Sequence, residues 1–316
     1  MHRPKPPAHQ IRPILLLEMA AELVWDRDWP AHHTRLLMSK QGAGNPVQYN
    51  LVSSDSPSSF DEVVRKEVQL AMVNPDAPLG MAVRGMGPYK EPMPLRVITT
   101  IPSLDQFAFG VHESTGITSL AEIGAKRYPL RISMREQTDH ADYMAADAVF
   151  NLLGFSLDDI VSWGGKIVPR RGLRMDVESL RRGEFDAFFE EGIHVWLPQA
   201  LDAGMRLLPL DPPLAQALEA IGWPCSVITK DQFPELPEDI VAPDFSGWPI
   251  FTHAETPDEI VRWFCKALEA RKDRIPSEGG PVLPLERMCK DGEDTPLSAP
   301  LHTAAEAFWR EQGYLP

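Results

Sequence analysis

Short β-rich runs and amphipathic helical segments alternate along most of the chain, and this alternation is the strongest constraint on its fold. Helices are predicted at 14–40 with a break at Trp29-Pro30, and at 56–68, 119–124, 141–152, 175–183, 195–204, 256–275 and 301–313. Strands are predicted between them at 47–54, 68–74, 95–101, 106–112, 129–134, 185–192 and 205–210. Such alternation predicts an α/β protein with largely parallel sheets. Because 316 residues with 43% hydrophobic content exceed most single cores, two lobes or two domains are expected.

The overall charge and the cysteines exclude several classes of partner. The formal net charge is −14, and no run of Lys and Arg interleaves with aromatic residues, whereas nucleic-acid binding needs a basic footprint. Cys225, Cys265 and Cys289 fit no zinc spacing. Cys265 lies in an apolar helical pattern and is predicted to be a small buried side chain. One disulfide could form, but no pattern favours it.

The N-terminal segment determines the predicted location. Its uninterrupted apolar run covers only Ile14–Leu17 before Glu18, whereas a secretory signal needs about 7–15 apolar residues. No stretch approaches the roughly 20 apolar residues of a membrane span. As the sequence stands, we therefore expect a soluble, cytoplasmic protein without direct membrane insertion, and a periplasmic one if an upstream leader precedes Met1.

Charged and hydrogen-bonding residues fill the junction between the strand at 129–134 and the helix at 141–152. An apolar stripe of Ala141, Met144, Ala145, Ala148 and Leu152 predicts that helix, and Gly154 ends it. Ligands of open α/β sheets bind at the carboxyl ends of strands, beside helix N-termini. The junction therefore supplies candidate ligand-binding residues: Arg135, Gln137, Thr138 and His140. The competing interpretations are a helix cap at Thr138 or Asp139, a solvated Arg135 and a surface His140.

A second candidate cluster follows the buried strand at 185–192. Glu190, Glu191 and His194 lie at its carboxyl end, and a buried Glu beside a His is a reasonable acid–base pair. With His140 they could ligate zinc or manganese, but the spacing matches no established motif, so no metal and no cofactor is expected. The competing interpretation is a Glu that accepts backbone hydrogen bonds or pairs with an Arg.

The remaining candidates are polar turns and one aromatic residue. Ser53, Ser54 and Asp55 end one strand, Asn74 and Asp76 follow another, and Trp223 could line a pocket for an organic ligand. Turn formation explains the polar residues about as well as ligand contact does, and for Trp223 a place in the core is commoner than one in a pocket wall. The basic cluster at 170–174 is predicted to be a solvated loop.

Several segments in order resemble the solute-binding subunits of tripartite ATP-independent periplasmic (TRAP) transporters, TAXI subfamily. The segments include "SSFDEVVRKEVQLAMVNPD", "HESTGITSLAEIGAKRYPLRIS", "LLGFSLDDI" and "ESLRRGEFDAFFEEGI", and the resemblance covers about residues 50–316. The family's glycine-rich first ligand loop has no counterpart in residues 11–30. The resemblance implies a two-lobed α/β fold of the type II periplasmic-binding-protein class, with a ligand cleft between the lobes.

The resemblance also implies lobe boundaries and a function. Lobe I would be 1–108 plus 246–316, lobe II would be 109–245, and strands near 106–112 and 247–253 would form the hinge. The chain would capture a small organic acid, a carboxylate, and a membrane transporter subunit would be its partner. The alternative is a cytoplasmic enzyme on the same fold, a decarboxylase or lyase acting on an aromatic or other carboxylic acid. In that case His140, Glu190, Glu191 and His194 would be catalytic.

Overall fold

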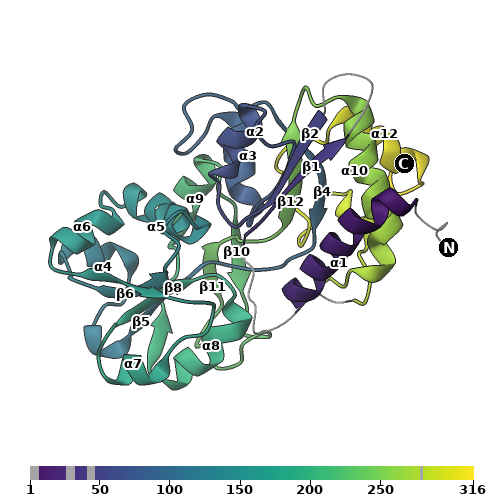
Figure 1. The fold of residues 1–316 in the computed structure, drawn as a ribbon. Coiled ribbons are helices and arrows are strands. Elements are labelled where there is room, and N and C mark those ends of the chain that lie inside the picture. Colours follow the sequence, from purple (N-terminus) through teal and green to yellow (C-terminus); the bar gives the residue numbers. More distant parts are fainter. Residues whose placement is uncertain (1–6, 26–32, 41–46, 278–279) are drawn as a thin grey trace.

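The computed structural model describes residues 7–25, 33–40, 47–277 and 280–316, which form two lobes that each contain a five-stranded sheet (Figure 1). The first sheet has the order β1 (Thr34–Lys40), β2 (Val47–Ser53), β3 (Leu70–Met72), β12 (Trp248–His253) and β4 (Leu95–Ile101). The second has the order β7 (Lys166–Arg170), β6 (Arg131–Arg135), β8 (Ala187–Glu190), β5 (Ala108–His112) and β9 (Met205–Leu207). A separate hairpin pairs β10 (Cys225–Ile228) with β11 (Ile240–Pro243). The predicted two-lobed α/β fold is confirmed.

The prediction of largely parallel sheets is wrong, because both sheets are mixed. Only β2–β3, β6–β7 and β6–β8 pair in parallel within the described residues. The other neighbours in the two sheets are antiparallel, and β12 pairs antiparallel with both β3 and β4. Four of these antiparallel pairs involve β12 or β5, which lie beside the places where the chain crosses between the sheets, and the fifth joins the successive strands β1 and β2. Simple strand–helix alternation cannot foresee these crossings.

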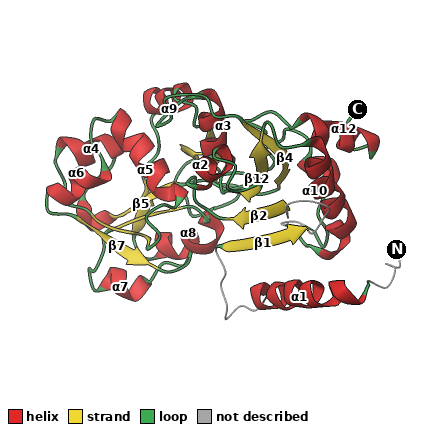
Figure 2. Ribbon diagram, turned by 45° about the horizontal axis from the view of Figure 1, so that its top comes forward, coloured by secondary structure: helices red, strands yellow, loops and turns green. Residues whose placement is uncertain are grey.

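Helices cover both faces of each sheet (Figure 2). In the first lobe, α2 (Ser59–Val64) and α3 (Asp76–Arg84) pack on one face, around Phe60, Leu79 and Phe251. The other face is covered by α10 (Asp258–Arg271), α11 (Leu285–Met288) and α12 (Thr303–Glu311). The buried Cys265 belongs to that second core, as predicted, and all three cysteines are free.

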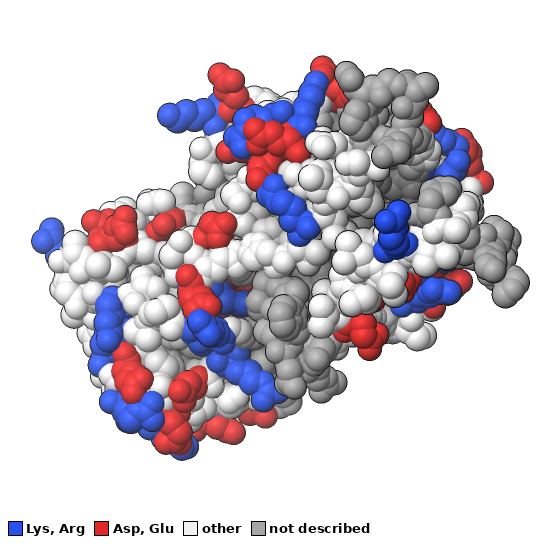
Figure 3. All heavy atoms as spheres, viewed as in Figure 1, with Lys and Arg blue, Asp and Glu red and all other residues white. Residues whose placement is uncertain are grey.

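The second lobe is layered in the same way. One face packs against α4 (Leu120–Ala125), α5 (Ala141–Leu152), α6 (Leu157–Ser162) and α9 (Pro212–Ala220). The other packs against α7 (Val177–Arg181) and α8 (Ile193–Asp202). Short 3₁₀ turns at Ala8–Gln10, Glu113–Thr115 and Lys272–Arg274 complete the helical elements. Acidic and basic side chains are interspersed over both lobes on the face shown in Figure 3.

Helix α5 differs from its prediction in two ways. The predicted apolar stripe faces the core only in part: Met144, Ala148 and Leu152 are half-buried, and the core side is formed mainly by Ala145, Ala146, Val149 and Phe150. The N-cap is His140, whose Nδ1 accepts from the Asp142 backbone N–H, and not Thr138 or Asp139. Gly154 has φ +84, as a glycine just after the end of a helix should.

The described parts of the region 14–40, residues 14–25 and 33–40, contain one helix and one strand where a broken helix was predicted. Helix α1 spans Ile11–Trp25 and buries none of its residues, while 34–40 form β1, an edge strand paired with β2 from Thr34↔Ser53 to Lys40↔Val47. Leu36, Leu37 and Met38 favour helix locally, but pairing with β2 satisfies their backbone groups in a strand. The predicted break at Trp29-Pro30 lies outside the described residues. No helix in the described part is long and apolar enough to span a membrane.

Two chain segments connect the lobes and are hydrogen-bonded to each other. The Phe107 N–H donates to the Pro243 carbonyl at 3.0 Å, and the Phe245 N–H donates to the Asp105 carbonyl at 2.9 Å. The Gly247 N–H donates in turn to the Ser103 carbonyl at 2.9 Å. The two connections therefore form one narrow ribbon. The lobe boundaries given above stay a prediction.

Candidate functional site

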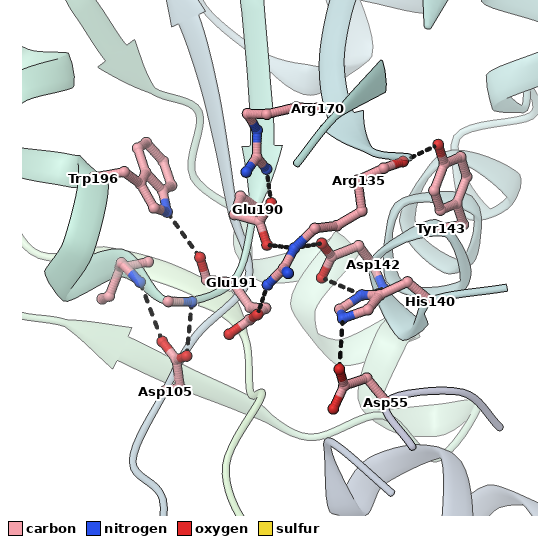
Figure 4. A network of polar contacts seen from close by, with 12 residues as sticks. Asp55, Asp105, Arg135, His140, Asp142, Tyr143, Arg170, Glu190, Glu191 and Trp196 are labelled. Carbon is pink, nitrogen blue, oxygen red and sulfur yellow. Dashed lines mark hydrogen bonds and ion pairs between the residues drawn. The ribbon is translucent and has the colours of Figure 1, made fainter. Parts of the chain in front are cut away.

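The carboxyl ends of three neighbouring strands in the second sheet bring ionised side chains together (Figure 4). Strands β6, β7 and β8 end with Arg135, Arg170 and Glu190, and parallel pairing brings these ends to the same edge. The Arg135 Nε donates to Glu190 Oε1 at 2.9 Å. Arg170 forms an ion pair with the other oxygen of the same carboxylate. Because Glu190 is fully buried, its charge depends on these two guanidinium groups.

The Arg170 side chain corrects the prediction of a solvated basic cluster. Its guanidinium lies 4.5 Å from the centre of the Phe188 ring. Burial, followed by repulsion from Arg135, lowers its pKa to about 10. Arg171, the next residue, is exposed and pairs with Glu136 at the surface, as a solvated loop would. The cluster therefore divides between the site and the solvent.

Glu191 and Asp105 form an acid pair beside Arg135. A second Arg135 nitrogen donates to Glu191 Oε1, while the backbone carbonyl of Glu191 accepts from Trp196 Nε1 at 2.8 Å. Asp105 belongs to the segment that connects the lobes, and its carboxylate accepts from the Gly192 and Ile193 N–H groups at the start of α8. Burial, then the charges of Asp142 and Asp105, holds the pKa of Glu191 well above its usual range.

Burial raises the pKa of Asp105 as well, but the hydrogen bonds from backbone N–H groups and from Glu191 oppose this rise. Burial thus raises the pKa of both acids, and the neighbouring charges of Asp142 and Asp105 raise that of Glu191 further. A carboxyl group whose pKa is raised by burial is chemically useful, because it holds its proton to higher pH than an ordinary carboxyl group and can donate it.

The start of α5 adds a histidine and a carboxylate. His140 is buried, and its Nδ1 lies 3.2 Å from the Asp142 backbone nitrogen, which donates to it, and 3.3 Å from Asp142 Oδ1. Asp142 is fully buried, and neither of its carboxylate oxygens has a hydrogen-bond partner within the described residues. Its nearest guanidinium atom is Arg135 Nε, at 4.0 Å. Tyr143 fixes the adjacent backbone by donating to the Arg135 carbonyl at 2.7 Å.

The two lobes meet at this point. The Ala141 N–H donates to the Asp55 carbonyl at 3.3 Å, and His140 Nε2 lies 3.9 Å from Asp55 Oδ2, so a turn of the first lobe contacts the start of α5. A polar cavity of about 290 Å³ opens beside the contact. It is bounded by Ser53, Ser54 and the start of α2 in the first lobe and by Asp139 in the second.

The candidate residues of the first lobe belong to two turns, one at the cavity wall and one at the start of α3. Ser54 is buried at the cavity wall, and its hydroxyl accepts from the Ser56 N–H at 3.0 Å, which is the turn interpretation. Asn74 and Asp76 are buried at the start of α3, where Asp76 accepts from the Ser298 N–H at 3.2 Å. Burial raises the pKa of Asp76 to about 7.

The candidates of the second lobe separate into two groups. Arg135, His140, Glu190 and Glu191 belong to the network, and Gln137 and Thr138 lie in the turn between Arg135 and His140, half-buried and exposed respectively. His194 is exposed and packs beside Phe233, with ring centres 5.1 Å apart. Trp223 is fully buried in the core and donates from Nε1 to the Asp244 carbonyl at 2.9 Å. These two positions give no support to a role in the site.

Sequence reasoning did not single out Asp105, Asp142, Tyr143 or Arg170. Asp142 could have been found, because an acid in the first turn of a helix at a strand end is a readable signal. Arg170 required the strand β7, which was not predicted. Within the described residues, no group of three His, Cys, Asp or Glu side chains is arranged to hold a metal ion.

No family model and no curated protein matches the chain. Among solved structures, it is similar to one described as a periplasmic transporter, at 15% identity over 78% of this chain and 73% of that chain, with TM-score 0.34. It is similar to MatC from Rhodopseudomonas palustris with bound malate, at 12% identity over 65% and 64%, with TM-score 0.34. PhnD1 from Prochlorococcus marinus with methylphosphonate gives 11% identity over 82% and 83%, with TM-score 0.41. Likenesses at this level decide neither the solute nor the TAXI subfamily, which stays a prediction.

Proposed function

We propose that this chain binds a small organic solute between its two lobes. The observation that carries the proposal is the contact of the Asp55 turn with the start of α5, beside a polar cavity of about 290 Å³. The strand ends and the start of a helix that meet there are the usual location of ligands in open α/β sheets. Opening at the ribbon between the lobes would admit the solute, and closing would cover it.

The charges at the site favour a solute with a positively charged nitrogen. The buried acids Asp142, Glu190 and Glu191 lie beside the guanidinium groups of Arg135 and Arg170, and the half-buried Asp105 adds a further acid. Glu190 is held by both arginines, and Asp105 by backbone N–H groups. Asp142 has His140 Nδ1 at 3.3 Å and Arg135 Nε at 4.0 Å, but neither carboxylate oxygen accepts a hydrogen bond within the described residues. An ammonium or amidinium group of the solute would supply the missing donors.

The organic acid predicted from the sequence fits this proposal only if the solute also carries such a nitrogen. Arg135, its predicted partner, already donates to Glu190 and Glu191. A solute with a carboxylate alone would add negative charge to a site where carboxylates already outnumber guanidinium groups. Delivery of the solute to a membrane transporter subunit remains part of the proposal and rests on the sequence resemblance.

The test is a thermal-shift series with matched carbon skeletons: butylamine, 4-aminobutyrate and butyrate, together with phenethylamine, phenylalanine and phenylpropionate. A solute at 100 times its Kd stabilises the fold by about 2.7 kcal/mol. We expect stabilisation by members with a charged nitrogen, lost in Asp142→Asn and kept in Asp158→Asn, a first-turn acid exposed on α6. Stabilisation by the pure acids alone would refute the charge argument. No response to any amine, amino acid or acid would refute solute binding.

The acid pair of Glu191 and Asp105 supports a second candidate, an enzyme on the same scaffold. A buried acid with a raised pKa could protonate a carbanion or a leaving group. Mass spectrometry of each bound solute after incubation tests this. If the chain is an enzyme, Glu191→Gln abolishes turnover while the solute still binds, and the exposed Glu184→Gln leaves both unchanged. Recovery of every solute unaltered excludes the candidate.

A further inference from the structure

A second, apolar cavity lies along α5, away from the polar network at the start of that helix. Its volume is about 510 Å³. The second lobe contributes Met144, Ala148 and Leu152 of α5 and Ile221 after α9. The first lobe contributes Met81 of α3 and Pro88 of the following turn. The cavity therefore has walls from both lobes, like the polar site, but the chemistry of the walls is different.

The α5 wall of this cavity accounts for the apolar stripe that the sequence displays. The side chains of Met144, Ala148 and Leu152 succeed one another at helical spacing and remain half-buried. The core requires only the opposite side of the helix, where Val149 and Phe150 are fully buried. A helix that covers its core on one side and repeats apolar residues on another presents a second surface for burial. In this structure that second surface faces open space.

The size and the wall chemistry indicate the kind of molecule that fits. Cavities of about 300–1,000 Å³ are typical of small-molecule sites, and 510 Å³ lies in this range. Methionine side chains are polarisable and adapt to irregular apolar shapes. Among the described residues that line the cavity, the polar side chains are Asn151 and Asp147, and the one charged group is the Asp147 carboxylate, whose Oδ1 already accepts from the Leu157 N–H at 2.9 Å. An organic anion would meet this carboxylate without a compensating cation from the wall.

We propose that this cavity binds a small, uncharged and largely apolar molecule that contacts both lobes. The site is separate from the solute site and does not depend on the proposed function. Because the walls come from α3 and α5, a bound molecule stabilises the lobe arrangement in which those walls face each other. By linkage it also raises the unfolding free energy of the whole chain.

The test is a fluorescence titration of the full chain with N-phenyl-1-naphthylamine, an uncharged probe that brightens in apolar surroundings. Ala148→Trp fills the cavity and is expected to weaken binding at least tenfold. The matched control is Ala267→Trp, which fills another apolar depression, beside Tyr49 and Trp263, and is expected to leave the affinity unchanged. An anionic naphthalene sulfonate of the same size is expected to bind at least tenfold more weakly to the unaltered chain.

Three results of this titration would contradict the proposal. Equal affinity in Ala148→Trp and the unaltered chain, or loss in Ala267→Trp instead, overturns the site. Equal or tighter binding of the sulfonate overturns the ligand class. If Ala148→Trp does not unfold cooperatively, Leu152→Ser is used in its place, because it makes the wall polar without adding volume, and it is expected to weaken the probe in the same way.

Discussion

Helices α3 and α5 lie on opposite sides of the lobe boundary and carry the same residue types at their first turns and at the apolar cavity. The surroundings of their first-turn aspartates differ. Each has a buried aspartate in its first turn, Asp76 or Asp142, and each contributes a methionine to the apolar cavity, Met81 or Met144. Asp142 lies beside Arg135 and within a network of charges, whereas Asp76 accepts one backbone hydrogen bond from Ser298. At Asp76, burial raises the pKa of the carboxyl group to about 7.

The apolar sides of the two helices differ as well. Met81 is fully buried and belongs to the core that the second lobe builds around α5, while Met144 is half-buried at the cavity. The boundary between the lobes therefore combines a charged contact, a packed apolar contact and the apolar cavity. Substitutions at these positions should have effects that differ in size and in their dependence on pH.

The largest effect is expected from Arg135→Leu. It leaves Glu190 with one guanidinium partner and removes the cation beside Asp142 and Glu191. Removing one partner of a buried charge network costs about 3–5 kcal/mol, measured by urea unfolding at pH 7.5. Arg171→Leu, which removes an exposed ion pair, is the control and should cost below about 0.5 kcal/mol. Equal losses in the two variants would contradict the assignment.

Asp76→Asn should sharpen the comparison of the two aspartates. The folded-state pKa of Asp76 is about 7, above its ordinary value of 3.8. The folded chain therefore binds this proton more tightly, and stability is lost as pH rises from about 4 to 7. The variant should gain about 1–3 kcal/mol over the unaltered chain at pH 8 and little at pH 4, by urea unfolding. A gain of the same size at both pH values would contradict the argument.

His140→Ala separates capping from solute binding. The loss of an N-cap costs about 1 kcal/mol, and the same cost is expected for Ser156→Ala, which removes the cap of α6. Only His140→Ala should also weaken a solute identified in the thermal-shift series, by about tenfold (one hydrogen bond of about 1.4 kcal/mol) in isothermal titration. If both variants leave solute affinity unchanged, His140 caps α5 and does not bind the solute.

The smallest effect is expected from Met144→Ala. Its side chain borders a cavity that already exists, so truncation should cost below about 1 kcal/mol. Phe150→Ala, on the core side of the same helix, should cost about 3–5 kcal/mol because Phe150 is fully buried against other aromatic rings. Urea unfolding measures both. A large loss for Met144→Ala would mean that the cavity closes in solution.

Much of the architecture follows from local sequence patterns. The strands β2 to β6, β8 and β9 lie where the alternating or buried runs predict them, and so do the long helices α5, α10 and α12. The exceptions have non-local causes. β1 is a strand because β2 pairs with it, although its leucines favour helix. Residues 166–170 form an edge strand beside β6, and no apolar alternation marks them.

The sequence identified the site residues that lie at strand ends, but it did not identify which side chains pair with one another. Arg135, Glu190 and Glu191 were found because polar residues after buried strands are conspicuous in sequence. Arg170 was assigned to solvent because a basic run shows nothing of Glu190, which lies two strands away in the sheet. Asp105 occupies an ordinary turn, and its role as the acceptor for the start of α8 involves residues 87 and 88 positions later. Contacts of this kind are set by tertiary structure.

The place of β12 has a consequence for the order in which the molecule can be completed during synthesis. All five strands of the second sheet lie between residues 108 and 207, so a ribosome that has released them has provided the whole of that sheet. The first sheet, although it begins earlier, still lacks the strand between β3 and β4 until residues 248–253 emerge. The first sheet therefore cannot be completed before these residues are synthesised. The second lobe, although most of it is synthesised later than the N-terminal strands, can already fold and bury its arginines.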